Sequence, residues 1–179
     1  MLPCLLRYAK VLWKKLSPSA TLADFQPRRT VASGVDDQWQ GDLIDLPNPK
    51  MFNNGHTLML IVVEKFSNFA WAEPLKNKTS NSTLKTFAKI LSRDGLKTLF
   101  LYSDRGLEFA NKLFQRYLKK KQIHLLTAQN QETESSTTER MIRTLWSRIW
   151  RNFTFKDTER YVDVLPDFHD PTVQHFIAA

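Results

Sequence analysis

The amino-acid sequence predicts an α/β domain, in which a mixed five-stranded sheet is flanked by helices. Three strand-like runs follow one another in the first half of the chain, which predicts an antiparallel meander. In the second half, short apolar runs alternate with segments whose apolar residues recur at helical spacing. A chain of 179 residues, 42% of them hydrophobic, is sufficient for one domain with a buried core.

The predicted folded unit begins near Gly34. Residues 1–33 are expected to form an N-terminal tail or linker, because the segment from Ser17 onward is polar, interrupted by prolines and without periodicity. The strands of the meander are expected at 39–46, 57–66 and 68–75. The breaker PNP, at 47–49, ends the first strand, and the turn residues SN separate the second from the third.

The remaining elements alternate between helix and strand. Thr79 is a suitable cap for a helix that Gly95 ends, with Leu84, Phe87, Ala88 and Leu91 on one face. The later elements are expected as a strand at 97–104, a helix at 108–121, a strand at 123–126, a polar loop at 127–136, a helix from Thr137, and one more helix at 156–165.

The charge balance favours a polyanionic partner. With 26 Lys and Arg against 18 Asp and Glu, the formal charge is +8, which favours nucleic acid over a membrane surface. Cys4 is the single cysteine, so an internal disulfide and a His/Cys zinc cluster within the chain are excluded. We therefore expect no zinc, a reducing compartment such as the nucleus or cytoplasm, and no secretion. No apolar run approaches the roughly 20 residues of a membrane span.

The stretch TTERMIRTLWSRIW, residues 137–150, forms an amphipathic helix in this prediction. Its apolar flank comprises Met141, Ile142, Leu145, Trp146, Ile149 and Phe153. Its other flank carries the arginines Arg140, Arg143, Arg148 and Arg151. Glu139 lies on the seam between the flanks. In the simplest interpretation, this acid favours the helix macrodipole and pairs with Arg143 one turn later.

Two further carboxylates give Glu139 a second interpretation. Asp42 falls within the first predicted strand, and Asp104 at the carboxyl end of the fourth. If these strands are neighbours, both acids converge there, and Glu139 could join them from its helix. Three carboxylates suit Mg²⁺ or Mn²⁺, which prefer oxygen ligands. The layout alone also allows strand-end acids by chance, because Asp36, Asp37 and Asp45 lie close to Asp42 in sequence.

Several ordered segments resemble the catalytic core of retroviral-type integrases. They are DDQWQGDLIDL, LIVVEKFSNFAWAEPLKNKT, YSDRGLEFANKLFQRYLKKKQIHLL, TTERMIRTLWSRIWRNFT and RYVDVLPD. The sequence is most similar to integrase-like proteins of transposon origin in animal genomes, including Maverick-type elements. The resemblance covers about 34–167 and implies an integrase catalytic core at 34–179 with a ribonuclease H-like fold. It also implies an Asp-Asp-Glu triad, formed by Asp42, Asp104 and Glu139, that holds two divalent ions.

The resemblance implies DNA 3′-end processing and strand transfer, with the arginine flank facing DNA phosphates and a possible homo-oligomer. The N-terminal zinc-binding module and the C-terminal DNA-binding domain of full-length family members have no counterpart in this sequence, and the final segment FHDPTVQHFIAA differs from the family pattern. One alternative is therefore a catalytically silent, transposon-derived remnant that binds nucleic acid. Another is a ribonuclease H-like hydrolase that acts on RNA–DNA hybrids.

Overall fold

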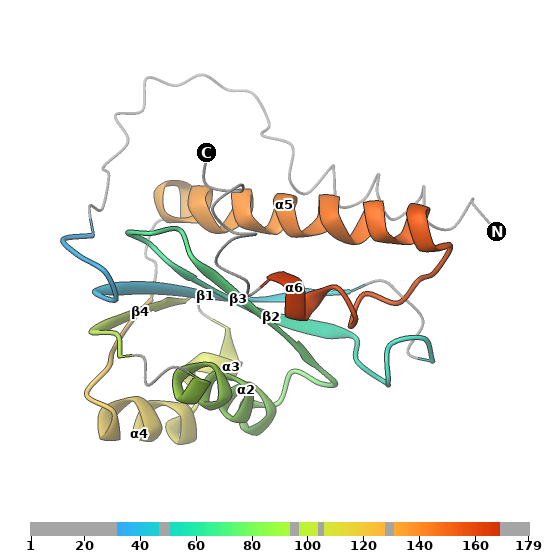
Figure 1. The fold of residues 1–179 in the computed structure, drawn as a ribbon. Coiled ribbons are helices and arrows are strands. Elements are labelled where there is room, and N and C mark those ends of the chain that lie inside the picture. Colours follow the sequence, from blue (N-terminus) through green and yellow to red (C-terminus); the bar gives the residue numbers. More distant parts are fainter. Residues whose placement is uncertain (1–31, 47–50, 94–96, 104–105, 128–130, 169–179) are drawn as a thin grey trace.

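The computed structural model describes residues 32–46, 51–93, 97–103, 106–127 and 131–168. The strands are β1 Gln38–Asp45, β2 Leu58–Glu64, β3 Ala70–Leu75, β4 Phe100–Ser103 and β5 His124–Thr127. The helices are α2 Ser80–Arg93, α3 Leu107–Ala110, α4 Lys112–Lys120, α5 Gln131–Lys156 and α6 Leu165–Phe168. The sheet forms the middle layer, with the long helix α5 on one face and helices α2, α3 and α4 on the other (Figure 1).

The five-stranded sheet has the order β3-β2-β1-β4-β5. β1 and β3 flank β2 as antiparallel neighbours, which confirms the predicted meander. β4 adds in parallel to the other side of β1, and β5 adds in parallel to β4. The first and fourth strands are therefore neighbours, as the interpretation of Asp42 and Asp104 required.

Alternate residues of the central strands enter two separate cores. On the α5 side, the core includes Met59, Ile61 and Val63 of β2 together with Leu145 and Ile149 of α5. On the α2 side, the buried core residues of the sheet include Trp39, Leu58, Leu60, Val62, Trp71 and Leu101. The first of these, Trp39, is completely buried, and its ring centre lies 4.6 Å from that of Trp71. Trp39 thus packs beneath the first strand, in the core on the α2 side.

The hairpin between β2 and β3 is held by the buried carboxylate of Glu64. Its Oε1 accepts a hydrogen bond from the Phe66 N–H at 2.8 Å, and its Oε2 accepts from both the N–H and the hydroxyl group of Ser67. These bonds satisfy an acid that is only 1% exposed. The carboxylate therefore has a structural role at the end of the sheet.

Helix α2 begins as the sequence predicted. The hydroxyl group of Thr79 accepts a hydrogen bond from the Ser82 N–H at 3.3 Å, which confirms the cap. Near the C-terminal end of α2, the exposed residues Lys89 and Arg93 form ion pairs with the buried carboxylate of Glu73 on β3, at 2.6 Å for Lys89. These pairs fix the end of α2 over β3.

The single helix predicted at 108–121 is two helices. Asn111 separates α3 from α4 with an extended backbone, at φ −69° and ψ 143°, and its side-chain oxygen accepts a hydrogen bond from the Leu113 N–H at 2.7 Å. Asparagine is among the preferred N-cap residues because its side chain replaces a missing backbone partner. The continuous apolar spacing concealed this break.

The predicted loop at 127–136 is also wrong. β5 ends at Thr127, and α5 begins at Gln131. Residues 131–136, QETESS, contain no glycine or proline, and two of them are glutamates that favour a helix N-terminus. The helix was not predicted here because these residues are all polar and show no apolar periodicity.

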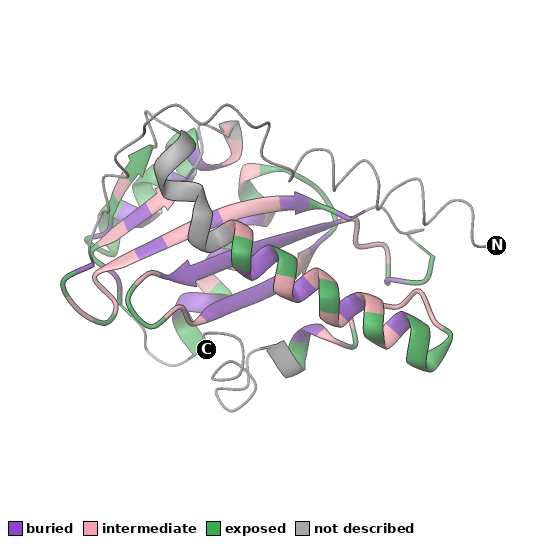
Figure 2. Ribbon diagram, turned by 90° about the horizontal axis from the view of Figure 1, so that it is seen from above, coloured by how far each residue is buried: buried purple, intermediate pink, exposed green. Residues whose placement is uncertain are grey.

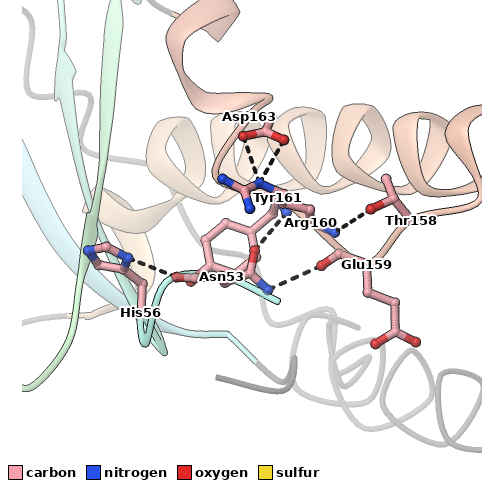
Figure 3. A network of polar contacts seen from close by, with 7 residues as sticks. All are labelled: Asn53, His56, Thr158, Glu159, Arg160, Tyr161 and Asp163. Carbon is pink, nitrogen blue, oxygen red and sulfur yellow. Dashed lines mark hydrogen bonds and ion pairs between the residues drawn. The ribbon is translucent and has the colours of Figure 1, made fainter. Parts of the chain in front are cut away.

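The helix predicted at 156–165 is wrong, because α5 ends at Lys156 and α6 begins only at Leu165. The intervening connection, residues 157–164, is not helical. The side-chain amide of Asn53 donates a hydrogen bond to the Glu159 carbonyl at 3.1 Å, and its carbonyl oxygen accepts from the Tyr161 N–H at 2.9 Å (Figure 3). These tertiary bonds occupy backbone groups that a helix would need. Pro166 then lies in the first turn of α6, where proline is tolerated.

Several predictions lie outside the described residues. They concern residues 1–31 of the predicted tail, the PNP breaker at 47–49, the end of a helix at Gly95, Asp104 and the altered final segment at 169–179. Within the part of the chain that the structure describes, no helix combines the length and the apolar character that a membrane span requires.

Candidate metal and nucleic-acid site

Asp42 lies on β1, the middle strand of the sheet, and its side chain is on the face that α5 covers. Side chains alternate along β1, and Ile44, two residues further on, belongs to the core beneath α5. Gly41 faces the opposite side, where an added Cβ would contact Leu101 and Phe109. Asp42 is half-buried, and its Oδ1 accepts a hydrogen bond from the Leu43 N–H at 2.8 Å. Its carboxylate therefore belongs to the α5-side face of the sheet.

The strand that leads to Asp104 runs beside the strand that carries Asp42. Gly41 and Ser103 are partners in the parallel register of β1 and β4. The residues that immediately precede the two predicted ligands in sequence are therefore neighbours. Asp104 itself lies outside the described residues, so its role as a metal ligand stays a prediction.

Glu139 lies on α5 at the edge of the helix surface that contacts the sheet. Met141 and Ile142 are buried in the same core as Ile44 of β1. The Glu139 side chain is 43% exposed, and its Oε2 lies 3.8 Å from the Arg143 Nη2. The predicted i to i+4 ion pair is thus present. Because so exposed a pair contributes little to stability, it leaves the carboxylate available to other partners.

The arginine flank of α5 faces away from the sheet. Arg140, Arg143 and Arg151 are exposed and Arg148 is half-buried, whereas the apolar flank is buried except for the half-buried Trp146 (Figure 2). The orientation predicted from helical spacing is confirmed. A contact between these arginines and DNA stays a prediction.

The other acids near Asp42 in sequence lie in different surroundings. Asp45 alternates to the opposite face of β1 and forms an exposed ion pair with Lys78 at 2.8 Å. Asp36 precedes the strand and accepts a hydrogen bond from the Trp39 Nε1 at 3.1 Å. Burial raises the pKa of Asp36, the Trp39 bond opposes this rise, and the charge of Glu64 adds to it. Neither acid shares the surroundings of Asp42.

The donor chemistry fits a hard divalent cation. Carboxylate oxygens are the ligands that Mg²⁺ and Mn²⁺ prefer. Asp42 and Glu139 belong to two layers that share one core, so both are positioned on the same side of the sheet. No group of three or more His, Cys, Asp or Glu residues able to hold a metal ion occurs among the described residues, which do not include Asp104.

Sequence reasoning missed two glutamines beside Asp42. Gln38 and Gln40 precede it on the same face of β1, and the side-chain oxygen of each is buried without a hydrogen-bond partner. Their partners across the parallel pairing with β4 are Phe100 and Tyr102. The alternation in QWQGD was the available signal, because it places both glutamines on the face of the aspartate.

Comparison with known families decides the classification. The model of the integrase core domain matches residues 32–133, more than half of the chain. The chain belongs to the integrase core domain family. Its sheet order and flanking helices are accordingly those of the ribonuclease H-like integrase fold, as predicted.

Individual relatives of this integrase core agree with that classification. A transposon-derived protein of Caenorhabditis elegans is 30% identical over 116 residues, which cover 65% of this chain and 40% of the relative. The Pro-Pol polyprotein of simian foamy virus type 1 is 32% identical over 82 residues, or 46% of this chain and 7% of the polyprotein. The integrase core described here thus spans less than half the length of these relatives.

Solved structures show the same fold. The catalytic core domain of the HTLV-2 integrase, in complex with magnesium, has a TM-score of 0.62 at 19% identity and covers 75% of this chain and 82% of its own. The catalytic core domain of the BIV integrase has a TM-score of 0.59 at 21% identity and covers 73% of this chain and 79% of its own. The integrase core therefore keeps its architecture at low sequence identity.

Proposed function

We propose that this chain is a polynucleotidyl transferase core that acts on DNA phosphodiesters, in 3′-end processing and in strand transfer. The observation that carries the proposal is the position of Asp42. Its carboxylate lies on the α5 side of β1, directly after the residue that pairs with Ser103, which precedes Asp104 in sequence. Membership of the integrase core family supports the proposal, as does the net charge of +8.

Asp42, Asp104 and Glu139 are proposed to hold two divalent ions, Mg²⁺ or Mn²⁺. When bound, such a pair activates a water or hydroxyl nucleophile and neutralises charge at the leaving oxygen of a phosphodiester. The likeness to the magnesium-bound HTLV-2 core supports this assignment. Asp42 is suited to it because its Oδ1 accepts a hydrogen bond from the Leu43 N–H, on a strand that is paired on both sides.

The reaction needs no covalent bond to the protein. In 3′-end processing, water attacks a phosphodiester near the DNA end, and the bond to the 3′ oxygen breaks to leave a 3′-hydroxyl. In strand transfer, that hydroxyl attacks a phosphodiester of a second DNA and displaces its 3′ oxygen in line. Arg140, Arg143, Arg148 and Arg151 are proposed to bind the DNA phosphates and to hold the strand over the carboxylates. Formation of a homo-oligomer is proposed as well, since the similar HTLV-2 core is described in dimeric and trimeric forms.

The test compares two aspartates of the same strand. Purified wild-type chain, Asp42→Asn and Asp45→Asn are incubated with Mn²⁺ and a labelled duplex oligonucleotide, and cleavage and joining are resolved on a denaturing gel. We expect product from the wild type and from Asp45→Asn, whose parent residue is exposed on the opposite face, and a loss of at least about a hundredfold in Asp42→Asn. DNA binding without Mn²⁺-dependent product would instead indicate the silent, nucleic-acid-binding alternative.

A further inference from the structure

Strand β5 forms an edge of the sheet, and its outer side has no strand partner among the described residues. The sheet order gives β5 one neighbour, β4, to which it pairs in parallel. The His124 N–H donates a hydrogen bond to the Leu99 carbonyl on that inner side, at 2.8 Å. Because backbone groups alternate along a strand, the N–H and the carbonyl of Leu125 point to the outer side. An extended chain can form further hydrogen bonds there.

A groove of about 590 Å³ lies beside this edge, between α4 and β5, and is named here the β5 groove. Its apolar lining consists of Leu118, Ile123 and Leu125, and its polar lining includes Lys119 and Gln122. The apolar residues belong to the core on the α2 side or pack against it. The β5 groove therefore opens on the face of the sheet opposite the one that carries Asp42.

The end of α4 beside the β5 groove is positively charged. Lys119, Lys120 and Lys121 are exposed in the last turn of α4 and directly after it. Neither α4 nor β5 contains an acidic residue. Within the described part of the chain, the ion pairs leave these lysines unused. The charge therefore favours a partner that carries carboxylates or other anions.

The backbone groups of the edge distinguish an acidic peptide from a nucleic acid. Leu125 presents one donor and one acceptor, and a peptide strand supplies a partner for each, whereas phosphate oxygens only accept. The apolar floor at Leu118 and Ile123 is suited to an aliphatic side chain that projects from such a strand. DNA held at Asp42, on the opposite face, would leave the β5 groove accessible.

Other segments of this chain are less suitable occupants. Pairing of two β5 edges would bring the lysines of both copies together, and like charges repel. The β3 edge, on the other side of the sheet, contains Pro74, which has no N–H to donate. The segment 1–33 is itself basic, with Asp24 as its single acid. Charge and backbone chemistry thus both favour a different protein.

We propose that the β5 groove docks an acidic peptide of another protein, which adds as a strand to the outer edge of β5. The peptide backbone pairs with Leu125, an aliphatic side chain packs against Leu118 and Ile123, and acidic side chains contact Lys119 and its neighbours. The partner is accordingly a protein with an extended segment that is both acidic and partly apolar. This site is separate from the proposed DNA chemistry, and each can be tested without the other.

Binding of synthetic peptides to the purified full chain tests the proposal. The probe is a fluorescein-labelled peptide of about ten residues in which glutamate and valine alternate. Fluorescence anisotropy compares it with a glutamine–valine peptide and with a form that is methylated at every peptide nitrogen. We expect both to bind at least about tenfold more weakly, because the first lacks the charge and the second lacks backbone donors. Equal affinity of the methylated and unmodified peptides would overturn strand addition.

Variants locate the peptide on the protein. Lys119→Gln should weaken binding of the glutamate–valine peptide about fivefold, because one charge at the groove is removed. Leu125→Pro should weaken it at least about tenfold, since proline removes the outward N–H and is tolerated at sheet edges. Lys76→Gln is the matched control, because Lys76 is exposed directly after β3, at the opposite edge of the sheet. Its affinity should equal that of the wild type.

The outcome at Lys119 is decisive even if Leu125→Pro fails to fold, which circular dichroism would reveal. Unchanged affinity in Lys119→Gln contradicts the assignment. An equal loss in Lys119→Gln and Lys76→Gln would show that net charge alone attracts the peptide, and this result also overturns the proposal.

Two alternative occupants have readouts of their own. Single-stranded DNA is added as a competitor, and displacement of the peptide at equal charge concentration would show that the groove binds any polyanion. Sedimentation velocity over a range of protein concentrations tests the second copy: self-association that Lys119→Gln strengthens would show that β5 edges pair with each other. Either result would replace the acidic peptide as the occupant. We expect neither, because DNA lacks alternating backbone donors and the lysines of two copies repel.

Discussion

At the scale of single residues, Tyr161 carries an unusual polar group. Its side chain is 1% exposed, and its hydroxyl group has no hydrogen-bond partner among the described residues. Burial raises the pKa of Tyr161 to about 12, because the charged phenolate is disfavoured away from water. The Tyr161 ring belongs to the core beneath α5, and its hydroxyl group is left there without a hydrogen-bond partner among the described residues.

Tyr161→Phe should therefore remove an alkaline instability. Above the unfolded pKa of about 10, the unfolded tyrosine releases its proton while the folded one keeps it, so the free energy of unfolding falls as the pH rises toward 12. At pH 11, one unit above the unfolded pKa, the loss amounts to about 1.4 kcal/mol, and the phenylalanine variant should lack it. Urea unfolding followed by circular dichroism at pH 8 and pH 11 measures the difference between wild type and variant, in which the titration of lysines cancels. Parallel losses in both proteins would contradict the role of Tyr161.

The candidate ligands show how far single residues can be predicted from sequence. The face of Asp42 followed from strand alternation, and the seam position of Glu139 followed from helical periodicity, since both are local properties of the backbone. Strand alternation places Asp45 on the opposite face of β1 from Asp42, but the choice of Asp42 as the ligand came from the resemblance to integrases. The surroundings of Gln38 and Gln40 required the pairing of β1 with β4, which no local pattern specifies.

At the scale of elements, the strands and α2 were predictable and the connections after α5 were not. β2 is buried on both faces and α2 has a capped, one-sided apolar pattern, so local preference and tertiary structure agree. In contrast, residues 157–164 have a helical spacing that the bonds to Asn53 override. A competition between local and tertiary hydrogen bonds cannot be read from the segment alone.

Asn53→Ala tests that competition. The change removes both side-chain bonds to the connection after α5 and leaves buried backbone groups unsatisfied, for an expected cost of about 2–4 kcal/mol in the free energy of unfolding. Hydrogen exchange should show a selective loss of protection at the Tyr161 amide.

His56→Ala is the matched control for this prediction. The His56 Nδ1 contacts the Asn53 backbone carbonyl at 2.8 Å within the same turn, so the variant disturbs the turn without removing the long-range bonds of the Asn53 side chain. We expect a cost of no more than about 1 kcal/mol and a protected Tyr161 amide. Equal exchange at Tyr161 in both variants would indicate that the turn itself, and not the Asn53 side chain, holds the connection.

At the scale of the whole molecule, the positive charge and the position of α5 on the outside of the sheet both favour DNA binding. The chain carries a net charge of +8, and the arginine flank lies on the outer surface of the layer that contains Glu139 (Figure 2). Phosphate binding by this flank releases counterions, so affinity for DNA depends on salt concentration.

Arg140→Gln and Arg151→Gln should each reduce the slope of log affinity against log salt by about 0.9 in duplex binding. Lys85→Gln provides the control, because this substitution removes the same charge from the other side of the sheet. Lys85 is exposed on α2, in the layer opposite α5. Its slope should equal that of the wild type. A uniform change in all three variants would mean that net charge, and not the α5 surface, determines binding. The charge could be predicted from composition, whereas its placement required the helix orientation.

The two hydrogen bonds of Asn53 also constrain the order in which the polypeptide acquires its structure. They join positions 106 and 108 residues apart in sequence. During synthesis, the turn that carries Asn53 leaves the ribosome long before its partners, so the core on the α5 side stays incomplete until the last described helices have emerged. Among the described residues, the members of the core on the α2 side end at Leu125, so this core can close first. A nascent chain released before Tyr161 would therefore present the apolar face of β2 and β3 to chaperones.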